Sequence, residues 1–285
     1  MPTVTTLLGH AQVEMALVCL GSLLRCSAEP VALRLLDDGT LRPEDLERLE
    51  GGLGRCELVP RAAADEAAAE VLARRPALAD FRRESPLARK LIDAVLLAGD
   101  ELAFCDTDIL YLRRFSGLFR LPSGAGALFM SDRQNAYSVR SWHLLTRRRL
   151  ALPRHVNSGI VVYRTAAWDP DLLEWYLARP EHRFAPVWVE QTGWALLGWQ
   201  AGCRLIDPAQ VAIPEPGRPP REETGETVAL HFVGPVRSLL RLDDPPVSDE
   251  TSPPVEIRTR PASRCRVVDL ALDEARRVGR RVLGG

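Results

Sequence analysis

The sequence lacks several features that would place it in a simple functional class. It has no run of about 20 apolar residues that could span a bilayer and no secretory signal at its N-terminus. None of its six cysteines forms a C-x-x-C pair, which argues against a structural zinc site or a redox motif. The formal net charge of −1 provides no basic excess for binding nucleic acid in bulk. We therefore expect a cytoplasmic protein with reduced thiols.

The first half of the 285-residue chain alternates between predicted strands and helices. Apolar runs predict strands over 3–8, 31–36, 56–59 and 101–105, and helical spacing of apolar residues predicts helices over 13–24, 65–75 and 86–98. This alternation is typical of an α/β fold with a mostly parallel sheet and helices on both faces. An apolar fraction of 46% is enough for a sizeable core.

The second half is less regular. Strands are predicted over 124–130, 158–163, 204–206 and 228–233, and helices are predicted to begin at Asp169-Pro170 and to cover 190–197. Residues 214–226 are expected to form a loop, and residues 245–261 a linker with little capacity to pack. The tail over 267–283 is an amphipathic helix with arginines opposite its apolar face, which could dock on the protein or contact an anionic membrane surface.

The most informative stretch is Glu101 to Leu112, in which an apolar strand ends in Asp106-Thr107-Asp108. Ligand sites in open α/β sheets lie at the carboxyl ends of such strands. Two carboxylates one residue apart at that edge supply hard oxygen ligands, which suit Mn²⁺ or Mg²⁺ carrying a phosphate-bearing substrate. The pair alone is a weak motif, because aspartates are common in solvated turns.

Other segments follow or precede this pair in a particular order. They are Ala88-Arg89-Lys90, His155-Val156-Asn157-Ser158-Gly159, Glu190-Gln191, and His231-Phe232-Val233-Gly234 with Arg237. Together they resemble the GT-A glycosyltransferases, and most closely family 8. The resemblance implies a GT-A, Rossmann-like mixed sheet in a catalytic domain over 1–244. Its nucleotide-binding half would cover about 1–115 and its acceptor half about 116–244, followed by a linker and amphipathic helix over 245–285.

The resemblance also implies roles for individual positions. Asp106, Asp108 and His231 match the metal ligands. The positions that match donor-binding residues are Arg89, Asp106, Thr107, Asn157, Gly234 and Arg237. Those that match catalytic residues beside the reacting sugar carbon are Glu190, Gln191 and Asn157. Each residue type also has an ordinary structural use, such as a core histidine or a surface arginine.

The chain departs from the family pattern at the end of its first strand. The family usually carries an acidic residue there, near the nucleotide base, whereas this sequence reads Gly9-His10-Ala11-Gln12. Asp38, after the second predicted strand, could contribute instead. The motif that usually ends in Pro-Trp after the diphosphate-binding residue is replaced by Ser238-Leu239-Leu240.

The expected activity is metal-dependent transfer of a sugar from a nucleoside diphosphate sugar, most simply a UDP-sugar, to an acceptor hydroxyl with retention. The acceptor could be a glycan, a lipid-linked molecule or a small molecule, and the terminal helix is a candidate for peripheral membrane contact. Two alternatives remain open. One is a phosphatase of the haloacid dehalogenase type, in which Asp-x-Asp also follows a buried strand; the other is a GT-A-like protein that binds nucleotide or glycan without catalysis.

Overall fold

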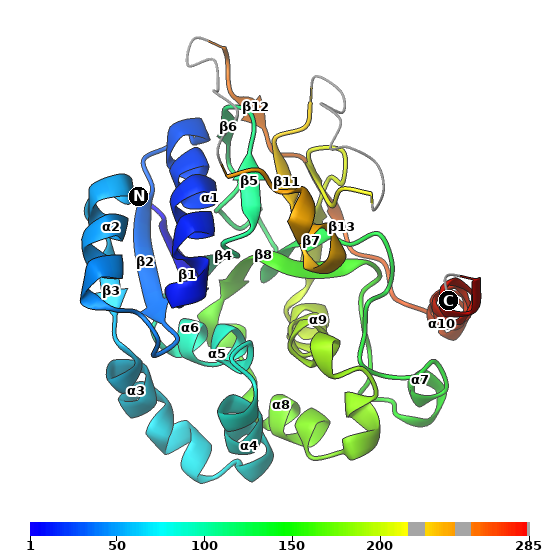
Figure 1. Cartoon of the computed structure of the whole chain (residues 1–285). Helices are drawn as coiled ribbons and strands as arrows, with labels where there is room; N and C mark the ends of the chain where they lie inside the picture. The colour runs from blue at the N-terminus through cyan, green and yellow to red at the C-terminus, as the bar shows by residue number, and fades with distance from the viewer. Residues whose placement is uncertain (216–225, 243–251, 284–285) are drawn as a thin grey trace.

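The computed structural model describes residues 1–215, 226–242 and 252–283. Within them, the main sheet has eight strands in the order β13-β9-β7-β8-β4-β1-β2-β3, and helices cover both of its faces (Figure 1). The strands of this sheet are β1 (Thr3–Leu8), β2 (Ala32–Asp37), β3 (Glu57–Val59), β4 (Glu101–Cys105), β7 (Ala127–Ser131), β8 (Val156–Arg164), β9 (Cys203–Ile206) and β13 (Thr259–Pro261).

Most of the sheet runs in one direction. Strands β4, β1, β2 and β3 are joined by parallel pairings, as are β7 and β9. Strand β8 pairs antiparallel with both β4 and β7, and β13 pairs antiparallel with β9. The predicted fold, a mixed and mostly parallel α/β sheet, is confirmed.

Two apolar cores lie on the two faces of this sheet. Along β4, Leu102 and Phe104 belong to one core, and Ala103 and Cys105 to the other, because successive side chains of a strand point to opposite faces. The prediction that this strand is buried on both faces is therefore confirmed. One face carries α1 (Val13–Cys26) and α2 (Pro43–Leu53); the other carries α3 (Arg61–Ala73), α4 (Pro76–Glu84), α5 (Ala88–Leu91), α6 (Asp93–Leu96), α8 (Pro170–Leu177) and α9 (Val189–Ala201).

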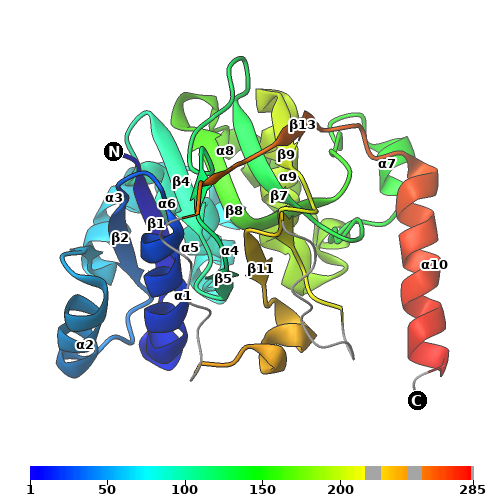
Figure 2. The ribbon, with the colours of Figure 1, turned by 90° about the horizontal axis from the view of Figure 1, so that it is seen from above.

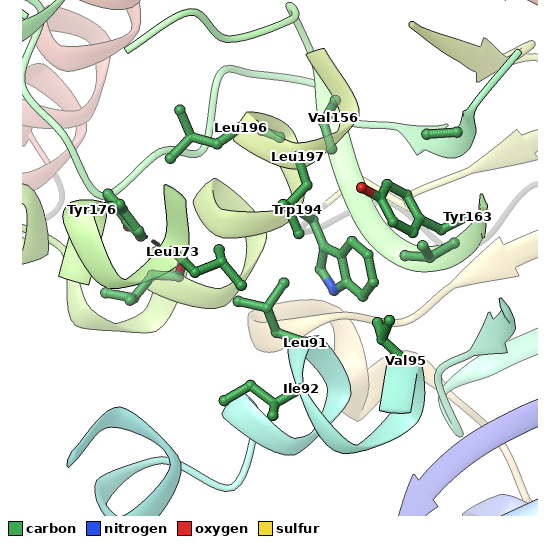
Figure 3. Close-up of a cluster of buried hydrophobic side chains, with 14 of the residues drawn as sticks. Leu91, Ile92, Val95, Val156, Tyr163, Leu173, Tyr176, Trp194, Leu196 and Leu197 are labelled. Carbon is green, nitrogen blue, oxygen red and sulfur yellow. Dashed lines mark hydrogen bonds between the residues drawn. The ribbon is translucent and has the colours of Figure 1, made fainter. Parts of the chain in front are cut away.

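Trp194 of α9 occupies the centre of the core that also contains Leu102 and Phe104 (Figure 3). Its ring packs edge-on against Tyr163 of β8, with the two centroids 5.3 Å apart. Leu91 of α5 and Val95 of α6 close the cluster from the other side. This packing holds α5 and α9 beside the end of β4, where the Asp pair lies.

Some predicted helices differ from the observed ones. The helix predicted over 86–98 is broken at Ile92 into α5 and α6. Helices α2, α4 and the short α7 (His143–Thr146) were not predicted. Most of the loop predicted over 214–226 lies outside the described residues.

A second, three-stranded sheet stands against the carboxyl end of β4. It contains β10 (Val211–Ala212), β11 (Ala229–His231) and β5 (Ile109–Tyr111). Strand β5 begins directly after the Asp pair and runs antiparallel to β11, with His231 paired to Ile109. This pairing places His231 next to the Asp pair, although the two are more than a hundred residues apart in the sequence.

The prediction of a linker over 245–261 is wrong for its described part. Strand β12 (Val255–Glu256) pairs with β6 (Phe115–Ser116), and β13 is an edge strand of the main sheet. Backbone hydrogen bonds do not require apolar side chains, and an edge strand tolerates proline because one side of it is unpaired. A composition rich in Pro and charge therefore gave a misleading signal here. The division of the chain into domains at residue 244 stays a prediction.

The C-terminal helix α10 (Val267–Leu283) is present as predicted and stands at the edge of the molecule opposite α2 (Figure 2). Its first turns contact the body through Leu270, which is fully buried, and through Asp273, which accepts hydrogen bonds from Asn135. Val268 and Leu272 are about half exposed, at 51% and 52%. None of the described helices combines the length and apolar character needed to cross a membrane.

Candidate metal and donor site

The Asp pair begins where β4 ends. The backbone N–H of Asp106 donates to the carbonyl of Gly159 on β8 at 2.8 Å, and the N–H of Phe232 donates to the carbonyl of Asp108 at 2.9 Å. The register between β7 and β8 shifts between Phe129 and Met130, so β8 carries extra residues beside the end of β4. Such bulges redirect side chains at sheet edges.

Asp106, Asp108 and His231 converge as predicted. One ligand atom from each lies within 4.8 Å of the others, close to the span of two metal–ligand bonds of about 2.1 Å. His231 Nε2 is 3.1 Å from an Asp108 oxygen and 3.7 Å from an Asp106 oxygen. This nitrogen is buried and makes no hydrogen bond of good geometry to any described residue. Two carboxylates and an unsatisfied imidazole nitrogen are a donor set that fits Mn²⁺ or Mg²⁺.

Lys90 is the closest cationic partner of Asp106. From α5 its ammonium donates to both Asp106 oxygens, at 2.9 and 3.0 Å, and to Ser158 Oγ at 3.4 Å. It also lies 3.7 Å from Glu190 and 4.9 Å from the centre of the Phe104 ring. The side chain is 2% exposed. A buried ammonium of this kind is stable only because it is paired with carboxylates.

The family resemblance implied Arg89 as the basic residue of this segment, whereas in the structure Lys90 contacts Asp106. A signal was available, because Lys90 is the only lysine among 37 lysine and arginine residues. An ammonium is a compact point charge with three rotatable donors, whereas a guanidinium is planar and larger. The one lysine of the chain occupies a buried position between two carboxylates, Asp106 and Glu190.

Burial and charge set the protonation of the acids. Burial raises the pKa of Asp106, although the Lys90 charge opposes the rise. Burial also pushes the pKa of Asp108 upward, but His231 and Arg237 outweigh it and lower the pKa to about 2. Burial raises the pKa of Glu190 to about 7, against the opposing charge of Lys90. The pKa of Lys90 is raised because its carboxylate partners outweigh burial.

Arg237 reaches the same cluster from the three-ten helix η5 (Gly234–Leu239). Its Nη2 donates to an Asp108 oxygen at 2.6 Å, and its side chain is 56% exposed. Gly234 starts this helix with φ of 57°, a left-handed conformation that favours glycine. Thr107 is buried between the two aspartates. An exposed guanidinium beside a buried carboxylate leaves donors available to a bound anion.

Arg89 points elsewhere. It is buried and donates through Nη1 to the backbone carbonyl of Asp38, at the end of β2. The Asp38 carboxylate lies over Gly9, where a Cβ would come within 2.3 Å of its oxygens. The absence of a side chain at Gly9 thus makes room for an acid from the neighbouring strand.

Asn157, Glu190 and Gln191 lie together behind the Asp pair. Glu190 accepts a hydrogen bond from Ser158 Oγ at 3.0 Å, and its other oxygen makes no hydrogen bond to any described group. Gln191 accepts from the Ser158 N–H and donates to the Ala136 carbonyl, at 3.3 and 2.9 Å. Asn157 contacts His231 and Asp132. Apart from Arg89, the predicted residues therefore lie around one cluster, to which the structure adds Lys90, Ser158 and Asp132.

Comparison with solved structures assigns this architecture to the GT-A glycosyltransferase fold. Mouse xyloside xylosyltransferase 1 in its apo form has a TM-score of 0.57 at 13% identity, over 81% of this chain and 97% of that one. The galactosyltransferase LgtC, in complex with donor and acceptor sugar analogues, has a TM-score of 0.53 at 14% identity, over 82% and 88%. No protein-family profile matches the sequence, and no curated protein matches it. At these identities the likeness concerns the fold.

Proposed function

We propose that this protein is a metal-dependent glycosyltransferase that moves a sugar from a nucleoside diphosphate sugar to an acceptor hydroxyl. The observation that carries the proposal is the convergence of Asp106, Asp108 and His231 within 4.8 Å at the carboxyl edge of a GT-A sheet. The GT-A fold disfavours the phosphatase alternative, whose family carries its Asp pair near the N-terminus, whereas 105 residues precede Asp106 in this chain.

Asp106, Asp108 and His231 would hold Mn²⁺ or Mg²⁺. When bound, the ion would neutralise charge on the leaving diphosphate. Arg237 is placed to donate to diphosphate oxygens, because more than half of its side chain is exposed while one edge is anchored on Asp108. Thr107, which lies between the two aspartates in the chain, and Gly234, which starts the helix that carries Arg237, are proposed to belong to the donor site. Lys90 keeps Asp106 oriented and balances the charge of the buried acids.

The nucleoside end of the donor is proposed to lie beside Gly9 and Asp38, where β1 and β2 end. Asp38 there takes the place of the acid that the family carries on its first strand, and Arg89 stays as a supporting cation beneath its carbonyl. A UDP-sugar is the proposed donor. The donor screen described below decides between bases.

Glu190 and Gln191 are proposed to act beside the reacting sugar carbon. The Glu190 oxygen that makes no hydrogen bond is buried 3.7 Å from the Lys90 ammonium; this oxygen is proposed to meet a sugar hydroxyl or to support positive charge. Its pKa of about 7 lets it hold or release a proton near neutral pH. Gln191 would help by fixing Ser158, which in turn bonds Glu190. We propose transfer with retention, and assign no covalent nucleophile.

The acceptor is proposed to be a glycan, a lipid-linked molecule or a small molecule in the cytoplasm. Peripheral membrane contact is proposed through α10. Support comes from Val268 and Leu272, whose apolar side chains stay half exposed although the helix is docked through Leu270 and Asp273. An apolar face left open beside arginines is suited to an anionic lipid surface.

A donor screen tests the function. The purified protein is mixed with Mn²⁺ and each of a panel of nucleoside diphosphate sugars, and thermal unfolding and slow donor hydrolysis are measured. A donor present at about 100 times its Kd stabilises the folded state by about 2.7 kcal/mol, which shifts Tm by several degrees in a protein of this size. A shift that needs both Mn²⁺ and one class of donor is the expected result.

The matched variants are Asp108→Asn and Asp80→Asn. Among the residues that the structure describes, Asp80 pairs only with Arg83, a surface arginine on α4, so its variant should keep the full shift, whereas Asp108→Asn should lose it. Binding of donor without turnover on any acceptor would indicate the non-catalytic alternative. Equal shifts in both variants would show that the Asp pair does not hold the metal, and the proposal would fail.

A further inference from the structure

His231 is held on two sides by different kinds of groups. Its Nε2 faces the two aspartates, and its Nδ1 lies 3.1 Å from the side-chain oxygen of Asn157. The His231 side chain is 2% exposed, so water contacts little of the ring. Which ring nitrogen carries the proton therefore depends on the protein groups around it.

The amide of Asn157 has one orientation that satisfies its neighbours. The backbone N–H of Gly159, which can only donate, lies 2.9 Å from Asn157 Oδ1. Asn157 Nδ2 lies 3.0 Å from a carboxylate oxygen of Asp132, which accepts. Both contacts place the amide oxygen, and not the nitrogen, against His231. His231 Nδ1 must then donate, so Nδ1 carries a proton, and in the neutral ring Nε2 keeps the lone pair that is directed at the metal site.

Gly159 completes this arrangement by leaving room for the ring. A Cβ on Gly159 would lie 2.4 Å from His231 Cε1 and 2.6 Å from His231 Nδ1. Both distances are far below ordinary contact, so a side chain at residue 159 would displace the imidazole. The asparagine and the glycine of the Asn157-Ser158-Gly159 segment thus have a role in positioning His231, besides any contact with a sugar.

We propose that Asp132, Asn157 and Gly159 are positioning residues that fix His231 as the Nδ1–H tautomer with Nε2 directed at the metal site. The inference rests on the proposed function, because the lone pair has a use only if a cation binds there. Asn157 then has the role of orienting His231, in addition to the contact with the donor sugar that the resemblance implied. Groups that orient metal-binding histidines typically change metal affinity by about 10–100-fold when removed.

The first test reads the tautomer without any metal. Protein labelled with ¹⁵N-histidine is studied by long-range ¹H–¹⁵N NMR, with His231→Gln used to assign the ring among five histidines. The spectrum is read on the neutral ring, after the pH has been raised until one proton remains. A proton on Nδ1 is expected. A proton on Nε2 would overturn the inference whatever the activity of the enzyme.

The second test compares the only two asparagines of the chain. Asn157→Ala removes the acceptor for His231 and should weaken Mn²⁺ binding by about 10–100-fold, measured by calorimetry or electron paramagnetic resonance. Asn135→Ala removes a buried asparagine that also bonds an aspartate, Asp273, and should leave Mn²⁺ affinity unchanged. Asn157→Asp keeps an acceptor on Nδ1 and should recover part of the affinity.

The outcomes separate this inference from the function itself. If the wild-type protein binds no Mn²⁺ but shows the Nδ1–H tautomer, the metal-dependent function fails and the tautomer assignment stands. If Mn²⁺ binds equally well to the wild type and to Asn157→Ala, the function stands and the positioning role is refuted. If Asn157→Ala does not fold, Gly159→Ala takes its place, and unchanged Mn²⁺ affinity in that variant refutes the role as well.

Discussion

Replacing Lys90 by methionine should expose how the buried charges of the site depend on each other. The variant keeps the length of the side chain but removes its charge from between Asp106 and Glu190, which lie 2.9 and 3.7 Å from the ammonium. At an effective dielectric constant of 20, those distances correspond to roughly 6 and 4 kcal/mol of attraction before the desolvation of lysine is subtracted. Removing one partner of a buried pair costs about 3–5 kcal/mol in comparable cases.

The loss should depend on pH. Burial raises the pKa of Glu190 to about 7 even with Lys90 present, and without that cation the pKa should rise further. A raised carboxyl pKa means that the folded state binds more protons than the unfolded state, so stability falls as the pH rises through the window from about 4.3, the ordinary glutamate pKa, to the folded pKa. In the variant, the higher pKa of Glu190 extends the pH range over which stability is lost to higher pH. Its deficit relative to wild type should therefore be larger at pH 8 than at pH 5.5.

Urea unfolding at the two pH values measures this directly. Adding Glu190→Gln to the Lys90→Met variant removes one of the two unpaired acids, so it should recover part of the stability at pH 8 and reduce the difference between the deficits at the two pH values. Arg83→Met serves as control, because Arg83 forms a surface pair that is 69% exposed at the arginine and is worth at most about 1 kcal/mol. The buried-pair account would be refuted if Lys90→Met lost less unfolding free energy than Arg83→Met. It would also be refuted if the loss in Lys90→Met were the same at pH 5.5 and pH 8.

Other expected outcomes concern the core, the donor and the terminal helix. Trp194→Ala should lower the free energy of unfolding by about 3–5 kcal/mol because the buried indole leaves a cavity, whereas Trp142→Ala, at 53% exposure, should change it by no more than about 0.5 kcal/mol; urea unfolding checks both. Arg237→Met should weaken nucleoside diphosphate binding by roughly tenfold or more, as the loss of a charge-assisted hydrogen bond implies, measured by calorimetry. Leu272→Glu should reduce flotation with vesicles containing phosphatidylserine and leave catalysis on a soluble acceptor intact; equal flotation of both forms would remove α10 from any membrane role.

Local patterns in the sequence were sufficient for the elements that bury long apolar stretches. The strand–helix–strand run over β1, α1 and β2 and the strand that ends at Asp106 were predicted because periodicity reports burial directly. Helix α2 was missed although Pro43 in its first turn and Asp45, which accepts from the Arg42 N–H, are local start signals. Helix α4 depends in addition on a partner that the local sequence does not show. The first turn of α4, for example, is capped from α8, where Glu174 accepts hydrogen bonds from the N–H groups of Ala77 and Leu78.

The residue types of the candidate site were also available from the sequence, as two acids after a buried strand and a distant histidine. Their meeting was decided by tertiary structure, because only the antiparallel pairing of β5 with β11 carries His231 to the Asp pair. Tertiary structure also decided that Lys90 and not Arg89 faces Asp106, since adjacent residues of a helix point in different directions and the placement of α5 turns Lys90 towards the Asp pair and Arg89 towards Asp38. The sequence specifies which chemical groups the chain carries and in what order. The distances between them in space, which bring them together at one site, depend on the pairing of segments that are far apart in the chain.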